Sequence, residues 1–185
     1  VHRDGKIFRQ EYKEGKPVTE VKEIGKTKKT GTYTYFKPDA TVFKTTHFRF
    51  DKTADRLREL AFLNPLVQIT LEDERDNEKE VFHYPGGLKD FVSYVDTGNT
   101  TYVKPVFFEG EEKDDDGALT QVEVCFQYND GFSENVLSYV NNIHTLEGGT
   151  HVTGFRGALT RTFNNYANNA NGKKSKVTLS GDDFK

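Results

Sequence analysis

A regular alternation of apolar and polar residues over positions 121–128 constrains the fold more than any other feature of this sequence. Every second residue is apolar or aromatic, and the residues between are Gln, Glu and Cys, which is the period of a half-buried β-strand. The turn signal Asn129-Asp130-Gly131 follows directly. Residues 135–140 are therefore predicted to return as a second strand, so the chain must contain antiparallel sheet.

Other segments also read as extended chain. Residues 6–13 and 18–24 flank the turn-forming cluster at 14–17, and residues 32–36 alternate Thr with aromatic residues. These three segments predict a β-meander near the start of the chain.

The middle of the chain adds further strands. Residues 67–71 and 80–84 are predicted to pair across a polar turn at 74–77, and another strand is expected around 103–108.

Three segments instead carry the helical period. Apolar residues at spacings of three and four predict a helix after Asp51, the expected N-cap, and Asn64-Pro65 is expected to end it. A short helix is predicted to open after Pro85-Gly86-Gly87, with its apolar residues between Leu88 and Val95 and its end at Gly98, and the longest helix is predicted over about 150–167. The apolar face of the longest helix is Val152, Phe155, Leu159, Phe163 and Tyr166. Strand runs mixed with helices that do not strictly alternate predict an α+β domain with helices packed on one face of a sheet.

Composition sets wider limits. The 185 residues suit one domain, or one and part of another. With 15 Phe and 9 Tyr, the chain can form a core although it has no Trp or Met, and such aromatic content argues against disorder.

The single Cys125 excludes an internal disulfide and fits a reducing compartment. No apolar run is long enough for a bilayer, so no membrane partner is expected. Because Met is absent, there is no initiator, and we expect the chain to be part of a longer protein.

Charge is unevenly distributed along the chain. Residues 1–60 carry 15 basic and 9 acidic side chains, residues 61–145 carry 5 and 17, and residues 146–185 carry 6 and 3. Two basic ends therefore flank an acidic middle, whose most acidic stretch, residues 109–116, is predicted to be a solvated loop. This division is compatible with a polyanion bound on one face, and equally with acidic surface loops that happen to cluster.

The sequence contains no recognisable catalytic constellation. No two of the five His residues have metal-binding spacing, Cys125 has no nearby His, and no Ser lies in a Gly-x-Ser-x-Gly elbow. Gly25-Lys26-Thr27 resembles the end of a P-loop, but Glu20 occupies the position that requires Gly.

Gly86-Gly87 and Gly148-Gly149 precede predicted helices, where free N–H groups can hold an anion. Tight packing at the helix start is the favoured interpretation of both.

Two arginines on the longest predicted helix are candidates for phosphate contacts. Arg156 lies at the border of its apolar stripe, and Arg161 lies about 140° around the helix from it. They do not form one basic stripe, so if either meets a phosphate, the two serve different surfaces. Solvated positions are the alternative for both, and for the lysines that follow, Lys173, Lys174 and Lys176.

Residues 139–166 contain Gly148-Gly149-Thr150-His151 and, from Gly154 to Arg161, the pattern Gly-Phe-Arg-x-Ala-x-Thr-Arg. With these motifs the segment resembles the B subunit of bacterial DNA gyrase, a type IIA topoisomerase component of the GHKL ATPase family. Further motifs follow the same order along the chain: Lys29-Thr30-Gly31-Thr32, residues 56–64 (RLRELAFLN), His83-Tyr84-x-Gly-Gly, Tyr128-Asn129-Asp130-Gly131-Phe132 and Leu179-Ser180-Gly181-Asp182-Asp183. The related ParE subunit of topoisomerase IV shares Gly-Gly-Thr-His but usually lacks the Gly-Phe-Arg-x-Ala-x-Thr-Arg that follows it. Gyrase is therefore preferred.

The resemblance implies a domain division and a fold. Residues 1–35 would be the C-terminal strands of the GHKL ATPase domain, and residues 36–185 an incomplete transducer domain. The transducer has a mixed sheet with a left-handed βαβ crossover, which would be truncated here at its C-terminus. ATP and Mg²⁺ would serve the intact protein, and no cofactor, metal ion or catalytic residue is expected in this chain.

The resemblance also implies a function. The intact cytoplasmic enzyme would introduce negative supercoils into DNA, and this segment would couple ATP-driven dimer closure to DNA strand passage, without activity of its own. Its partners would be double-stranded DNA, the A subunit of gyrase and a second copy of the B subunit, with Arg156 and Arg161 near the cavity that holds the DNA. The alternatives are ParE and a non-catalytic nucleic-acid-binding module that uses its aromatic residues as stacking platforms.

Overall fold

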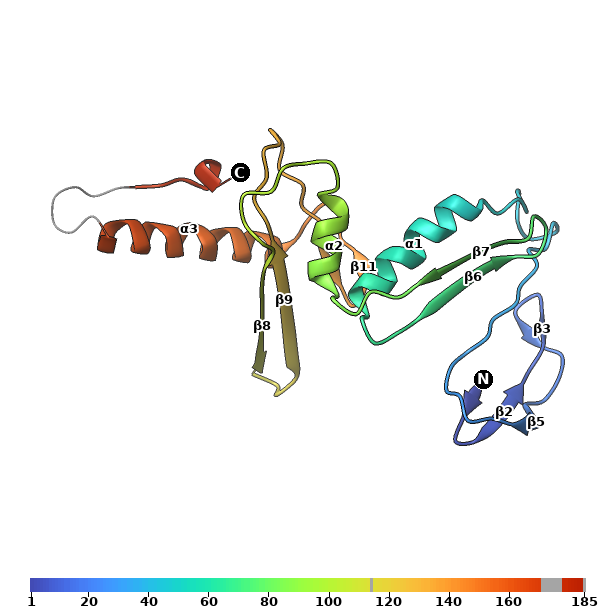
Figure 1. Ribbon diagram of the computed structural model, residues 1–185. Coiled ribbons are helices and arrows are strands. Elements are labelled where there is room, and N and C mark those ends of the chain that lie inside the picture. Colours follow the sequence, from blue (N-terminus) through green and yellow to red (C-terminus); the bar gives the residue numbers. More distant parts are fainter. Residues whose placement is uncertain (114, 171–177, 185) are drawn as a thin grey trace. The chain divides into compact units, whose positions relative to one another are not determined.

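The computed structural model describes residues 1–113, 115–170 and 178–184. The chain forms two compact units, Val1–Arg49 and Phe50–Lys185 (Figure 1). Each unit is a group of residues that contact one another, and such a unit need not coincide with an evolutionary domain. The predicted domain boundary after residue 35 therefore stays a prediction.

The Val1–Arg49 unit is built on short antiparallel strands. Strands β1 (His2–Arg3), β2 (Lys6–Arg9) and β5 (Lys22–Lys26) form one sheet in that order, and β3 (Tyr12–Lys13) pairs with β4 (Lys16–Pro17). Positive φ angles at the turns support both hairpins, with Gly5 at 79° and Gly15 at 76°.

The third strand predicted for this unit, residues 32–36, does not form. Gly31 makes a single bridge to His2, and the following residues have no partner strand. Tyr33 and Tyr35 are 73% and 64% exposed. Alternation alone therefore did not produce a strand, because a strand also needs a neighbour to satisfy its backbone groups.

The core of the Phe50–Lys185 unit lies where two helices meet a hairpin. Helix α1 (Phe50–Leu63) packs against β6 (Ile69–Asp73) and β7 (Glu78–Phe82), and helix α2 (Leu88–Val95) contacts α1 (Figure 1). The buried apolar side chains of the described residues are Ala54, Ala61, Phe62, Phe82 and Phe91.

Aromatic stacking centres on Phe62. Its ring centroid lies 3.8 Å from that of Tyr84 and 4.7 Å from that of Phe91. Helix α1 ends before Asn64-Pro65, as predicted, but it begins at Phe50, so Asp51 lies in its first turn and is not the N-cap.

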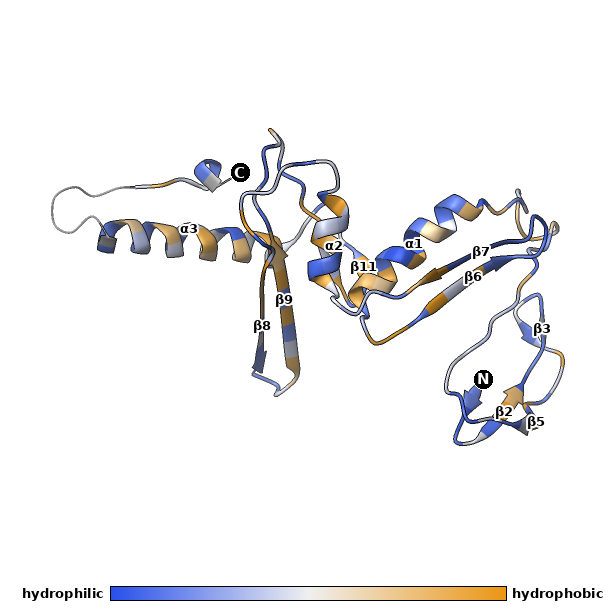
Figure 2. Cartoon of the chain, in the orientation of Figure 1, coloured by the Kyte–Doolittle hydropathy of each residue, from blue (hydrophilic) through white to orange (hydrophobic). Residues whose placement is uncertain are grey.

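A long two-stranded ribbon corrects the prediction of an acidic loop. Strand β8 (Val106–Lys113) pairs along its whole length with β9 (Leu119–Phe126), and Glu109 faces Glu123 across the ribbon. Residues 109–113 are therefore strand, although all are exposed. Cross-strand backbone hydrogen bonds outweigh the repulsion of neighbouring acids, which water screens at exposed positions. Figure 2 shows hydrophobic residues at the β9 end next to α3.

The predicted return strand after β9 is also wrong in part. Residues 135–138 form no strand, and β10 (Tyr139–Val140) pairs with β11 (Ile143–His144) instead of β9. Asn141 and Asn142 form the turn between them with φ angles of 49° and 65°. A two-residue Asn-Asn turn in the left-handed region favours this local hairpin over pairing with a more distant strand.

The longest helix, α3 (Thr150–Ala170), matches its prediction and extends three residues further. Four residues of its predicted apolar face are half-buried, but Tyr166 is 73% exposed. A short 3₁₀ turn follows at Gly181–Phe184. Asn164 holds the chain before this turn, because its side chain accepts from the Leu179 N–H at 2.7 Å and donates to the Leu179 carbonyl at 2.9 Å.

The α+β class is thus confirmed. The described strands, however, form five separate sheets in which every pair is antiparallel, where the prediction had one mixed sheet. The left-handed crossover stays a prediction.

Candidate nucleic-acid interface

Helix α3 is the element with the simplest charge pattern. It contains Arg156 and Arg161 and no Asp or Glu, whereas α1 and α2 carry side chains of both signs. An acid-free helix attracts anions along its length, and the positive end of its dipole adds to that attraction in the first turn.

The start of α3 depends on Gly148 and Gly149. Gly148 has a φ of 76°, in the left-handed region that favours glycine, and a Cβ added to Gly149 would lie 2.8 Å from the His151 ring. At the other pair, Gly87 has a φ of 59° and lies against Pro65. Both glycine pairs therefore serve backbone geometry and close packing.

Phe155 sets the rotation of α3 about its own axis. Its ring centroid lies 6.3 Å from that of Phe108 on β8 and 6.1 Å from that of Phe126 on β9. Because successive residues of a helix are about 100° apart, Arg156 is turned away from the ribbon that Phe155 contacts.

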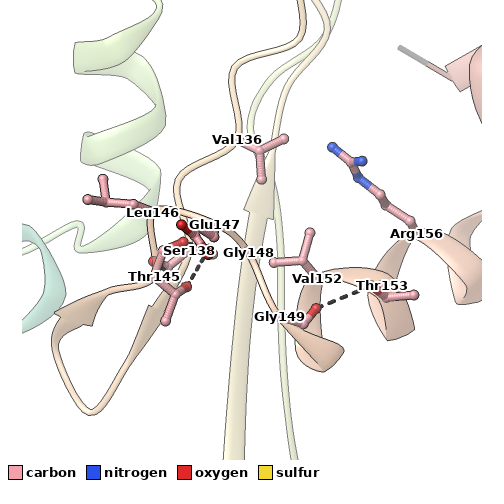
Figure 3. A pocket seen from close by; sticks show the side chains of 10 residues that line it. All are labelled: Val136, Ser138, Thr145, Leu146, Glu147, Gly148, Gly149, Val152, Thr153 and Arg156. Carbon is pink, nitrogen blue, oxygen red and sulfur yellow. Dashed lines mark hydrogen bonds between the residues drawn. The ribbon is translucent and has the colours of Figure 1, made fainter.

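Arg156 borders a pocket of about 280 Å³ beside the first turns of α3. In Figure 3 its side chain extends from α3 toward Val136. The Ser138 and Thr145 hydroxyls in the wall lie 2.6 Å apart, and each also bonds to the other residue's carbonyl oxygen. The wall is formed by Val136, Ser138, Thr145, Leu146, Glu147, Gly148, Gly149, Val152, Thr153 and Arg156.

The two predicted arginines have different surroundings. Arg156 donates from Nη2 to Glu134 Oε2 at 2.7 Å, in an ion pair whose side chains are 48% and 33% exposed. Arg161 is exposed and forms no ion pair with another described residue. Their five-residue separation places them on different sides of α3, so the structure does not bring them to one point.

Glu134 is a functional candidate that sequence reasoning missed. It lies 22 positions before Arg156 in an irregular segment, and neither periodicity nor a motif connects the two. The three lysines predicted to follow the helix, Lys173, Lys174 and Lys176, lie outside the described residues.

In the described part of the chain, no group of three or more His, Cys, Asp or Glu side chains is placed to bind a metal ion. Within the same residues, no helix combines the length and apolar character needed to cross a bilayer.

The sequence model of one family, DNA gyrase B, matches residues 87–185, which include α2, the β8–β9 ribbon and α3. The chain belongs to the DNA gyrase B family. It is 48% identical over 195 residues to the DNA gyrase B subunit of Chitinophaga japonensis, covering all of this chain and 40% of that relative.

A second relative belongs to the sister enzyme. The chain is 48% identical over 168 residues to the DNA topoisomerase 4 B subunit of Bacillus subtilis, covering 90% of this chain and 25% of that relative. Equal identity to both kinds of protein does not separate them.

A solved structure has the same fold. The 43K ATPase domain of Thermus thermophilus gyrase B, crystallised with an aminocoumarin, superimposes with a TM-score of 0.80 and 33% identity. The alignment covers 99% of this chain and 50% of that one.

Proposed function

We propose that this chain is part of the B subunit of an ATP-dependent type II DNA topoisomerase, and that the intact enzyme is a gyrase. The observation that carries the proposal is the family match over residues 87–185. The segment would couple ATP-driven closure of a dimer to the passage of one DNA duplex through another, by favouring one of two arrangements of rigid elements.

Within that function, α3 is the element that faces DNA. Arg156 and Arg161 contact phosphates, and such contacts position a duplex without reading its sequence. The acid-free sequence of α3 and the exposure of both arginines support this role. Each phosphate contact makes the slope of log affinity against log salt concentration more negative by roughly 0.9.

ATP and Mg²⁺ belong to the intact protein in this proposal, together with the gyrase A subunit and a second copy of the B subunit. The described residues lack a cluster of metal-ligating side chains, so no step through Mg²⁺ or nucleotide is assigned to them. A steady-state ATPase assay on the 185-residue chain should give the buffer rate, and turnover above it would overturn this assignment.

The type of topoisomerase is decided by the product. The intact B subunit, combined with its A subunit, is incubated with relaxed plasmid and ATP. The plasmid products are then resolved on gels containing an intercalator. A gyrase yields negatively supercoiled plasmid. Efficient decatenation without negative supercoils would assign the chain to topoisomerase IV, which the similarity to the Bacillus subtilis protein keeps as the second candidate. DNA binding without any topological change would favour a binding module.

A further inference from the structure

The ion pair between α3 and the loop that follows β9 has a consequence for DNA binding. We propose that Glu134 masks Arg156 when DNA is absent, and that a DNA phosphate displaces Glu134 when the duplex arrives. This inference rests on the proposed function, because the residue that Glu134 would mask is the same arginine.

The geometry leaves Arg156 with one anionic partner. Its guanidinium donates to Glu134 Oε2 at 2.7 Å, and no other hydrogen bond or ion pair of the guanidinium occurs among the described residues. A phosphate oxygen can take the place of the carboxylate oxygen, because both accept charge-assisted hydrogen bonds from a guanidinium. The exchange replaces one anion by another and leaves no buried charge unpaired.

The loop around Glu134 can move without disturbing the core. Residues 131–137 are all exposed, and Phe132, two positions before Glu134, has its side chain fully exposed to solvent. Glu134 makes no hydrogen bond to another described residue apart from Arg156. Displacing its carboxylate therefore breaks a single contact.

The exposure of the pair limits the size of the effect. Ion pairs this exposed contribute about 0.2–1 kcal/mol, which corresponds to a reduction in DNA affinity of up to about fivefold. Because dissolved salt screens exposed charges, the reduction should be largest at low ionic strength and should disappear at high salt.

A second explanation for the ion pair is purely structural, with Glu134 fixing the loop against α3. The two explanations differ in sign. A structural contact gives weaker or unchanged DNA binding when it is removed, whereas a mask gives tighter binding.

The test uses fluorescence anisotropy to measure how a labelled DNA duplex binds the intact protein, from low to high salt, for four variants. Glu134→Gln removes the mask, and Arg156→Gln removes the masked group. The double variant joins the two changes. Glu147→Gln is the matched control, because Glu147 lines the same pocket and loses the same charge but makes no ion pair with another described residue.

The proposal expects Glu134→Gln to bind DNA about two- to fivefold more tightly than the unaltered protein at low salt. Glu147→Gln should change affinity less, and Glu134→Gln should have no effect when Arg156 is already Gln. A gain that equals that of Glu147→Gln, or that persists in the double variant, overturns the mask. If Arg156→Gln itself leaves affinity unchanged, the phosphate contact of the proposed function fails and the mask fails with it.

Discussion

At the scale of single residues, Arg58 connects the elements around the main core. Its guanidinium donates to Glu80 on β7 at 2.8 Å and to Asp55 on α1 at 2.7 Å. The guanidinium carbon also lies 5.3 Å from the ring centroid of Phe82 and 5.6 Å from that of Tyr94. The hydrogen bond to Glu80 raises the pKa of Arg58 further above its ordinary value, so its charge persists at every accessible pH.

Replacing Arg58 should therefore destabilise the protein. Because its side chain is only 17% exposed, Arg58→Ala is expected to lower the free energy of unfolding by about 2–3 kcal/mol, through the loss of two charge-assisted hydrogen bonds and two cation–π contacts. Arg58→Lys should recover only part of this lost stability, since an ammonium group cannot reproduce the planar, forked set of donors of a guanidinium. Urea denaturation measures both.

The control is Lys79→Ala on the β6–β7 hairpin, which Arg58 contacts through Glu80. Lys79 pairs with Glu72 at 2.9 Å, but the two side chains are 57% and 55% exposed, so its loss should cost under about 0.5 kcal/mol. Equal effects of Arg58→Ala and Lys79→Ala would contradict the account of Arg58.

Tyr139 gives the protein a pH dependence above neutrality. Partial burial, helped by the negative charge of Glu59, raises the pKa of Tyr139 to about 12, from an ordinary value of about 10. The folded protein then keeps the phenol proton after the unfolded chain has lost it. The free energy of unfolding is therefore unaffected by this group below about pH 10 and falls as the pH rises from about 10 to about 12.

This prediction is measured by denaturant unfolding at several pH values from about 9 to about 12. Tyr139→Phe should reduce the loss of stability over the upper part of that range while leaving the fold intact, because Phe keeps the ring that packs against Phe91 and His144. Identical pH dependence in the variant and the unaltered protein would show that Tyr139 does not control it.

At the scale of elements, α3 is held to the β8–β9 ribbon chiefly by Phe155. Phe155 contacts a ring on each strand, and replacing a half-buried Phe with Ala should lower the free energy of unfolding by about 2 kcal/mol. Tyr166→Ala, at an exposed position on the same helix, should change it by under about 0.5 kcal/mol. Circular dichroism melting curves compare the two, and a larger loss from Tyr166→Ala would place the attachment elsewhere.

The helices could be predicted well because each buries one side. The spacing of Leu88, Phe91 and Val95 indicated the start of α2, although the helix ends at Val95 and not at the predicted Gly98, and Asn64-Pro65 indicated the end of α1. In the helices, burial leaves a periodic record in the sequence. The alternation also located β9, but burial there does not follow that period, because Val122 is 50% exposed and only residues 124–126 are half-buried.

Elements without a buried face left no such record. Residues 109–113 are strand but are exposed throughout, so their acids indicated a loop. Conversely, residues 32–36 alternate like a strand but have no partner in the described residues. The β10–β11 hairpin was missed because two left-handed Asn residues were not recognised as its turn.

The candidate site was predictable only in part. Helical spacing placed Arg156 and Arg161 on different sides of the predicted helix, and in the structure both residues are exposed on α3. The contact between Arg156 and Glu134 joins residues 22 positions apart through an irregular segment, and a single sequence carries no periodic signal for such contacts.

At the scale of the whole molecule, the charge division seen in the sequence acquires a structural form within the Phe50–Lys185 unit. The acids of residues 109–113 are exposed on the β8–β9 ribbon, whereas α3 carries only basic charged side chains. In the proposed function, a DNA duplex would be repelled by the acidic part of the ribbon and attracted by α3. This division supports the central claim, that the unit couples the ATP-driven step to DNA through α3.

The measurement that tests this claim most directly compares supercoiling with ATP binding in the intact protein carrying Arg156→Gln. When this variant is combined with its A subunit, the initial supercoiling rate should fall roughly tenfold or more. This is the effect of losing one charged hydrogen bond that contributes about 1.4 kcal/mol or more. Its affinity for ATP should change by less than about twofold, because Arg156 is proposed to contact DNA and not the nucleotide. Equal loss of supercoiling and of ATP binding, or loss of neither, would contradict the account.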